Sequence, residues 1–384
     1  MVLAWMLLCA SVPGDDPDNQ HWSFRPIRQP VPPKVRNNSW PQNAIDRFIL
    51  ARLEAEGLHP AQAATQQQLS RRIYFDLTGL PPAPRLKAGA GTPVRFGAYE
   101  QLVDQLLASP RYGEKWGQHW LDLARFAETD GFEHDKIRNT AWRYRDWVIR
   151  ALNEGMPYDE FVTRQVAGDE LKPNDPEQQF ATAFCLSGPD MPDINSQEQR
   201  RQNVLNELTG TVGATLMGLQ MGCAQCHDHK YDPIKQVEYY QMFAYYNQVD
   251  EPRREIPTAA DLNAQKAHEQ KITALTDKVN NAEQGSDARK KLEAELAQLK
   301  KKRPRATTAL VMMQRSSPRM THRFIQGNFT RPAEEVKPGV PNILHSFPKA
   351  ESANRLDFAR WVTSRNNPLM ARVTVNRMWL HYFG

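Results

Sequence analysis

The chain has 384 residues, 40% of them hydrophobic and 24% charged, which is typical of a soluble globular protein with two or three domains. Its net charge of +5 is mild, and no Lys/Arg stripe with interleaved aromatics is present, so we expect no nucleic-acid partner. The dinucleotide, Walker A and serine-hydrolase motifs are absent, which removes the commonest nucleotide-binding and hydrolase classes.

The first residues, MVLAWMLLCAS, resemble a short export leader that lacks a basic start. We therefore predict an export leader over residues 1–20 and a periplasmic or otherwise exported protein. No later segment is apolar enough to predict a transmembrane span. After a Pro-rich segment, apolar spacing predicts helices over residues 45–53, 69–77 and 102–107, each followed by Gly or Pro.

Residues 111–130 are dense in aromatic and ionisable side chains. Helical spacing over residues 116–127 places His119 on an apolar face, where it is either a core histidine or a ligand. Asp122 lies on the adjoining face, and Asp130 follows the expected end of this helix. Another helix carries Trp142 and Trp147 with interspersed arginines, and residues 168–195 are predicted to be mainly loop.

The most informative stretch is GCAQCHDHKYDP, residues 222–233. Its Cys-x-x-Cys-His pattern is that of c-type haem attachment, in which two thiols alkylate the haem vinyl groups and the histidine binds the iron. On this interpretation Cys223 and Cys226 hold the haem and His227 is its axial ligand. The opposite ligand would come from His119, His134, Met217 or Met221.

The motif is expected at a helix–turn–helix corner. A helix over residues 197–219 leads into it, and Asp232 and Pro233 are a good N-cap and first residue for the next. That next helix carries a run of aromatics, which either pack in the core or wall a porphyrin. We expect both helices to pack on the helix over residues 116–127.

The continuation Asp-His-Lys-x-Asp-Pro is not required for haem attachment and leaves two alternatives open. In the first, the site is a non-haem zinc or calcium site of a hydrolase-like or metal-binding domain. It would use Asp228, His229 and Asp232 together with the earlier residues His119, Asp122 and Asp130. In the second, the cysteines form a redox or structural pair. Whether the protein is an enzyme stays open.

The remaining chain predicts three further parts. Residues 251–305 read as an antiparallel helical hairpin, a coiled-coil insertion whose 261–303 portion could contact a polymer or protein partner. Residues 306–345 alternate as a short β and loop segment, and residues 346–384 are helical. The predicted fold class is mainly α, with a helical domain over residues 21–250 organised around the Cys-x-x-Cys-His corner.

Several blocks occur in an order that resembles a known family: RRIYFDLTGLPP, SPRYGEKWGQHWLDLARFAETDGFE, AWRYRDWVI, AGDEL and GCAQCHDHKYDPI. Over about Ile45 to Tyr246 the chain resembles the planctomycete cytochrome-like family, a domain of unknown function. Residues 354–384 look like the opening of its usual companion domain, so we expect a truncated C-terminal helical domain. The resemblance implies an exported bacterial protein with a haem-like centre, an unidentified redox partner and no established reaction.

Overall fold

A computed structural model describes residues 21–82, 96–132, 134–173, 175–347 and 353–384. The predicted leader over residues 1–20 lies outside the described residues. The structure is mainly helical, as predicted, with short antiparallel strand pairs. None of the helices in the described part of the chain combines the length and the apolar character that crossing a bilayer requires.

The helices are α1 (Ala44–Ala55), α2 (Gln66–Thr78), α3 (Phe96–Leu107), α4 (Pro110–Leu123), α5 (Trp142–Asn153), α6 (Tyr158–Leu171), α7 (Pro176–Ala181), α8 (Gln197–Val212), α9 (Gln236–Asn247), α10 (Ala259–Asn281), α11 (Asp287–Lys301), α12 (Arg355–Val362) and α13 (Pro368–Phe383). Short turns of helix are η2 (Trp22–Phe24), η3 (Thr182–Leu186), η4 (Gly213–Met217), η5 (Met221–Gln225) and η6 (Ile325–Gly327). The strands are β1 (Val249–Asp250), β2 (Arg253–Glu255), β3 (Thr308–Leu310), β4 (Met313–Gln314), β5 (His322–Phe324) and β6 (Pro332–Glu335).

Local signals fix many of the helix ends. Capping boxes open α1, α2, α10 and α12, in which the N-cap side chain and the third helical residue satisfy each other's backbone N–H groups. Gly79 ends α2 in the left-handed region, at φ 70°, as a glycine does most readily. Two expectations are wrong: α4 ends at Leu123 rather than near Ala127, and α6, α7 and η3 cover much of the stretch predicted as loop.

The core is built around aromatic side chains of α4, α5 and α6. Trp120 Nε1 and the Tyr144 hydroxyl both donate to Gln165 Oε1, at 2.7 and 2.6 Å, so the polar tips of these buried rings are satisfied. Trp147 stacks on Phe161 with centroids 5.4 Å apart. Each such buried side chain contributes about 2–3 kcal/mol of transfer free energy, so this cluster is one large contribution to the stability of the fold.

Helix α9 supplies the other half of the core. Its aromatic run is fully buried: Tyr239, Tyr240, Phe243, Tyr245 and Tyr246. In this structure these aromatic side chains therefore pack in the core, which is the first of the two roles that the sequence allows. Helix α8 packs on α9, whereas α4 packs mainly on α5 and α2, so the expectation that both motif-flanking helices pack on α4 is not met. The same core continues through α12 to Met370 at the start of α13.

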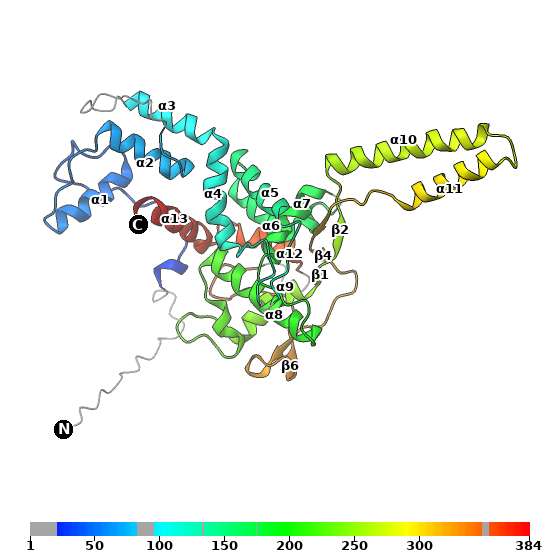
Figure 1. The fold of residues 1–384 in the computed structure, drawn as a ribbon. Coiled ribbons are helices and arrows are strands. Elements are labelled where there is room, and N and C mark those ends of the chain that lie inside the picture. Colours follow the sequence, from blue (N-terminus) through cyan, green and yellow to red (C-terminus); the bar gives the residue numbers. More distant parts are fainter. Residues whose placement is uncertain (1–20, 83–95, 133, 174, 348–352) are drawn as a thin grey trace, which may run out of the picture.

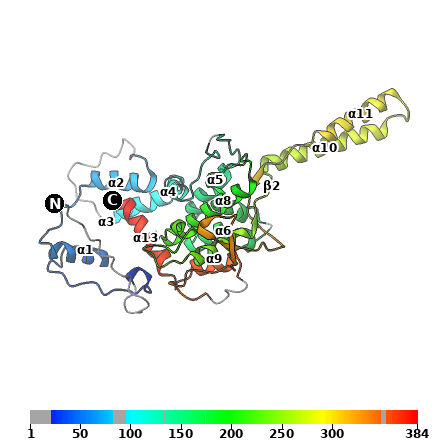
Figure 2. The ribbon, with the colours of Figure 1, turned by 90° about the horizontal axis from the view of Figure 1, so that it is seen from below.

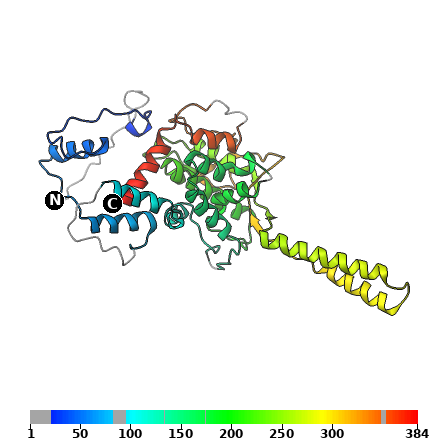
Figure 3. The ribbon, with the colours of Figure 1, turned by 90° about the horizontal axis from the view of Figure 1, so that it is seen from above.

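The predicted hairpin is present as α10 and α11, which project from one end of the molecule (Figures 1 and 2). Its base is a strand ribbon: β2 pairs with β3, with Arg253 opposite Leu310 and Glu255 opposite Thr308, and β1 pairs with β4. The chain thus leaves the core on β1 and β2 and returns to it on β3 and β4. Helices α1 to α3 and α13 lie at the opposite end (Figure 3).

Candidate functional site

A single helical turn presents the two motif cysteines. The π-type turn η4 extends α8 to Met217, and Gly218 ends it with a φ of 68°. In the following turn η5, the Met221 and Ala224 side chains are fully buried. Cys223 and Cys226 are three positions apart, so they lie on one side of a 3-10 turn, and both are exposed and free of disulfides. One face of the turn is anchored and the other displays both thiols.

The His227 ring is exposed beside these thiols, and its tautomer is fixed by one contact. Its Nδ1 lies 2.7 Å from the backbone oxygen of Asp228. Since a carbonyl oxygen only accepts hydrogen bonds, Nδ1 carries a proton, and in the neutral ring the lone pair is then on Nε2. Metal-ligating histidines usually donate their second ring N–H to such an acceptor. The ring therefore offers Nε2 as a ligand atom.

Gln236, at the start of α9, connects the motif turn to the rest of the fold. Its side-chain amide donates to the backbone oxygens of Gln225 and Phe324, at 2.9 and 3.0 Å. Its Oε1 accepts from Arg323 Nη1 at 2.9 Å. The Tyr240 hydroxyl donates to the same Gln225 oxygen at 3.0 Å. These bonds hold the turn from both α9 and β5, so its position is set by the core.

The β5–β6 hairpin approaches the thiol of Cys226. A Cβ atom at Gly327 would stand 2.7 Å from Cys226 Sγ, and Gly327 has a φ of 74°. Both facts require glycine at this position, because any side chain would be strained and would displace the thiol. Cys226 is therefore bordered by η6 as well as being exposed.

The second half of the motif builds the turn that leads into α9. His229 Nδ1 accepts the backbone N–H groups of Asp232 and Tyr231, at 2.7 and 3.2 Å. Asp228 Oδ1 accepts the N–H of Gln236 at 2.7 Å, which satisfies one free donor of the first helical turn. These contacts give Asp228 and His229 a structural use that explains their spacing after the Cys-x-x-Cys-His pattern.

Helix α9 begins later than predicted. Its N-cap is Lys235 and its first residue Gln236, so the N-cap role assigned to Asp232 is wrong. Asp232 Oδ2 lies 3.6 Å from His229 Nδ1 within the preceding turn, and Ile234 donates its N–H to the Asp232 oxygen at 2.8 Å. The backbone groups of Asp232 and Ile234 are therefore hydrogen-bonded within the turn, and the helix begins only after them.

The earlier predicted residues have other partners. His119 stacks on His381 of α13 at 3.8 Å between centroids, and burial and the nearby His381 lower its pKa. Asp122 is exposed on α4, and Asp130 pairs with Arg138 at 2.6 Å. Over the described ranges, no three His, Cys, Asp or Glu side chains are grouped so that they could hold a metal ion.

The remaining candidates for the opposite haem ligand are also located. Met217 and Met221 are 1% and 0% exposed, and their side chains belong to the core. His134 is exposed and lines a pocket between residues 130–136 and 190–195. In their described positions the two methionines face protein on all sides, so neither serves as a ligand without movement of the core.

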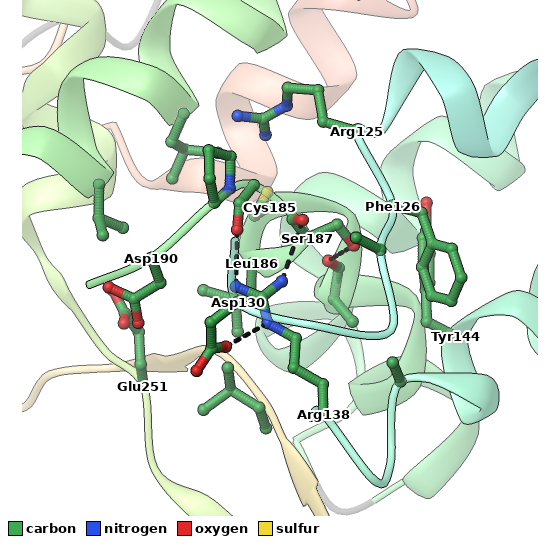
Figure 4. Close-up of a pocket in the computed structure, with 18 of the residues that line it drawn as sticks. Arg125, Phe126, Asp130, Arg138, Tyr144, Cys185, Leu186, Ser187, Asp190 and Glu251 are labelled. Atoms are coloured by element: carbon green, nitrogen blue, oxygen red, sulfur yellow. Dashed lines mark hydrogen bonds and ion pairs between the residues drawn. The ribbon is translucent and has the colours of Figure 1, made fainter. Parts of the chain in front are cut away.

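A second feature, absent from the sequence-based expectations, is a cavity of about 450 Å³ (Figure 4). It lies between the segment after α4, the start of α5, the segment after η3, and the middle of α8. Both signs of charge line it. The cationic side chains are Arg125, Arg138, Arg143, Arg200 and Arg201, and the acidic ones are Asp130, Asp190, Glu207, Asp250 and Glu251.

Three of the five arginines are paired with lining acids. Arg125 Nη1 lies 2.7 Å from Glu207, Arg138 Nε lies 2.6 Å from Asp130, and Arg200 Nε lies 2.7 Å from Asp190. These pairs leave Arg143 and Arg201 without an acidic partner among the ion pairs of the described residues. The lining as a whole is formally neutral, but these two arginines have no ion pair that balances their charge directly.

Arg138 holds two walls of the cavity together. Besides its pair with Asp130, it donates from Nη1 and Nη2 to the backbone oxygens of Ser187 and Gly188, at 3.1 and 2.8 Å (Figure 4). The Asp190 N–H donates to the Asp130 oxygen at 2.9 Å. The segment after α4 is thus joined to the segment after η3, although they are distant in sequence.

Glu251, which directly follows β1, also lines the cavity. Burial raises its pKa, Asp190 raises it further, and Arg200 and Arg201 oppose the rise only in part. Figure 4 shows the Glu251 and Asp190 carboxyl groups next to each other. The physical cause is the usual one: a desolvated carboxyl near a like charge keeps its proton to higher pH.

Sequence reasoning missed the cavity for an identifiable reason. The sequence marks Asp130 only as a possible metal ligand and Arg143 only as one of the arginines interspersed in an aromatic helix. No motif marks Arg138, Asp190, Arg200 or Glu251. The one available signal was the concentration of Arg and Asp around turns that follow aromatic helices.

The comparisons with known proteins give families but no activity. Residues 44–251, more than half of the chain, match the family model described as "Protein of unknown function (DUF1549)", also called PSCyt2. Residues 354–384 match a second model, "Protein of unknown function (DUF1553)", or PSD1. No curated protein and no solved structure matches significantly. The chain belongs to the DUF1549 family, and a segment of the DUF1553 family follows the matched region.

Proposed function

We propose that this protein binds a haem covalently through Cys223 and Cys226, that His227 would bind its iron, and that the protein takes part in electron transfer. The carrying observation is the pair of exposed, free thiols on one side of η5, next to an imidazole whose Nδ1 faces a carbonyl oxygen and whose other nitrogen is Nε2. This is the donor set that covalent haem attachment requires. A bound haem would supply one-electron redox chemistry.

The protein's own residues would supply attachment, orientation and environment. The hydrogen bond to the Asp228 oxygen would orient His227 and increase the basicity of its Nε2. Gln236 and Tyr240 would keep the turn from moving, and the η6 loop would border the Cys226 side. An exposed site is suited to electron exchange with a partner protein, because little protein separates it from solvent. We further propose export, since such attachment normally takes place outside the cytoplasm.

Five variants, produced with a c-type maturation system, test the assignment. Cys226→Ser should leave haem held by one thioether, and His227→Ala should shift the Soret band. Asp228→Asn and His229→Ala are matched controls from the same turn, which we expect to keep the wild-type band position. Cys185→Ser controls for thiol loss in general, because Cys185 is buried and its pKa is raised to about 12.

The reverse ordering would contradict the proposal. A sixth variant, Asp232→Ala, completes the set. If bound metal is lost from His229→Ala and Asp232→Ala but retained by His227→Ala, imidazole and carboxylate form the site and it is a non-haem centre. Metal analysis of the same preparations distinguishes iron in haem from zinc or calcium.

A further inference from the structure

The most unusual group in the arginine-lined cavity is Arg143. The residue is only 5% exposed, and its Nη1 donates to the Ile256 oxygen at 2.6 Å. Its Nε and Nη2 are buried with no hydrogen-bond partner. Burial lowers its pKa, and its guanidinium lies 5.1 Å from the centroid of the Phe180 ring. A guanidinium with two unused donors at a cavity wall is a strong candidate for binding an anion.

A second arginine of the lining, Arg125, repeats the pattern. Arg125 Nε and Nη2 are likewise buried and unpartnered, while its Nη1 pairs with Glu207. Its backbone has a φ of 57°, which is uncommon for a residue with a side chain. A Cβ at Gly188 would stand 2.6 Å from Arg125 Nη1, so a glycine there makes room for the guanidinium. Strained backbone that positions an unsatisfied cation is typical of ligand sites.

The cavity also offers an unused acceptor. Within the described part of the chain, no hydrogen bond or ion pair engages the Glu251 carboxyl. A ligand hydroxyl would satisfy this group, and an acidic group would satisfy the spare donors of Arg143 and Arg125. Since the cavity is many times the volume of one water molecule, about 30 Å³, it has room for a ligand larger than an inorganic ion.

We propose that this cavity binds a small hydroxylated organic anion, whose carboxylate, sulfate or phosphate group contacts Arg143 and Arg125. The site is separate from the motif turn: none of its lining residues belongs to residues 218–235. The proposed anion site can therefore be tested independently of the haem proposal.

Titration calorimetry on the full chain, at constant ionic strength, tests this site. The probes are glucuronate, glucose 6-sulfate and glucose 6-phosphate, with glucose and inorganic sulfate as controls. We expect at least one acidic sugar to bind saturably, glucose not to bind, and inorganic sulfate to bind more weakly. The three acidic probes distinguish which anionic group the site prefers.

Variants then locate the binding. Arg143→Met keeps the apolar stem against Phe180 and should weaken binding about tenfold or more, the effect of losing a charge-assisted contact. Arg145→Met is the matched control, because Arg145 lies on the same helix, pairs with Glu128 and does not line the cavity. If Arg143→Met fails to fold, Val204→Trp offers an independent test, since Val204 is half-buried and lines the cavity.

Three results would overturn the proposal. They are no saturable binding of any acidic sugar, equal binding of inorganic sulfate, or unchanged affinity in Val204→Trp and in a folded Arg143→Met.

Discussion

The motif turn and the arginine-lined cavity are built in opposite ways. In the motif turn, the contacts that shape Asp228, His229 and the start of α9 join residues eight or fewer positions apart. In the cavity, Arg138 reaches Ser187, 49 positions away, and Arg125 reaches Glu207, 82 positions away. The first region displays its reactive groups to solvent, whereas the second encloses charges that have lost part of their hydration.

The difference shows what each region requires of the fold. A turn shaped by local hydrogen bonds needs little from the remainder of the chain beyond an anchor, here Gln236 and the buried face of η5. The cavity exists only when α4, α5, η3 and α8 are all packed. We therefore expect changes that loosen the fold to affect the cavity before the motif turn.

The largest effect should come from a change that disturbs both regions together. Arg355 is fully buried and donates to Asp169 Oδ2 at 2.6 Å and to the Val166 oxygen at 3.0 Å, which joins α12 to α6. Arg355→Met should lower the free energy of unfolding by about 3–5 kcal/mol, because it leaves a buried carboxylate unpaired. Chemical denaturation measures this, with exposed Arg360→Met on the same helix as control; a loss below about 1 kcal/mol would contradict the prediction.

A somewhat smaller effect should separate the two regions. Arg138→Met removes one ion pair and two hydrogen bonds that join the cavity walls, at an expected cost of about 2–3 kcal/mol. Anion binding in the cavity should be lost while haem content stays that of the wild type. Arg150→Met, which breaks a surface pair with Glu177, should change stability by less than about 1 kcal/mol. Equal loss of haem in Arg138→Met would show that the regions are coupled.

The local turn itself should tolerate change better. His229→Ala removes the acceptor of two backbone N–H groups, and we expect a loss of about 1–2 kcal/mol with haem content unchanged. Its exposed neighbour provides the control, Lys230→Ala, for which no effect on stability is expected. Thermal melts and absorption spectra of both variants check this, and loss of haem from His229→Ala alone would contradict a purely structural role.

The smallest effect concerns pH. The folded-state pKa of Glu251 is raised from its ordinary value of 4.5, so the folded protein binds more protons than the unfolded chain above that value. Wild-type stability should therefore decline as pH rises through the folded pKa of Glu251. Glu251→Gln should remove this part of the decline, so the Tm of the variant should rise relative to that of the wild type as the pH increases above 4.5. A difference in Tm between the two proteins that does not change with pH would contradict the raised pKa of Glu251.

Sequence patterns predicted the regions that local contacts determine. The mainly α fold, the α10–α11 hairpin and the short strands that follow it are confirmed. The end of α4 was misplaced because a helical pattern continued to Ala127 while the chain left the helix at Ala124 and entered the left-handed region at Arg125. The predicted start of α9 was wrong because Asp232-Pro233 matches the pattern of a helix start. In the structure the Asp232 N–H is bound by His229 Nδ1 within the preceding turn.

The candidate site was predictable only in its local half. Both thiols and His227 lie within five consecutive residues, so the sequence alone is enough to identify them. The grouping of His119, Asp122 and Asp130 with the motif depended on long-range packing, and those residues instead contact His381, solvent and Arg138. The cavity depends on such packing entirely, and charged residues of ordinary spacing give no sign of it.

The most direct test of the central claim is an absorption spectrum of wild-type protein matured in a periplasm with c-type haem machinery, taken after acid–acetone extraction. Covalent attachment through Cys223 and Cys226 predicts a Soret band that stays with the protein, together with one iron per chain. A protein that gives up all its colour to the solvent, or that carries zinc or calcium without porphyrin, would contradict the haem assignment and the electron-transfer function with it.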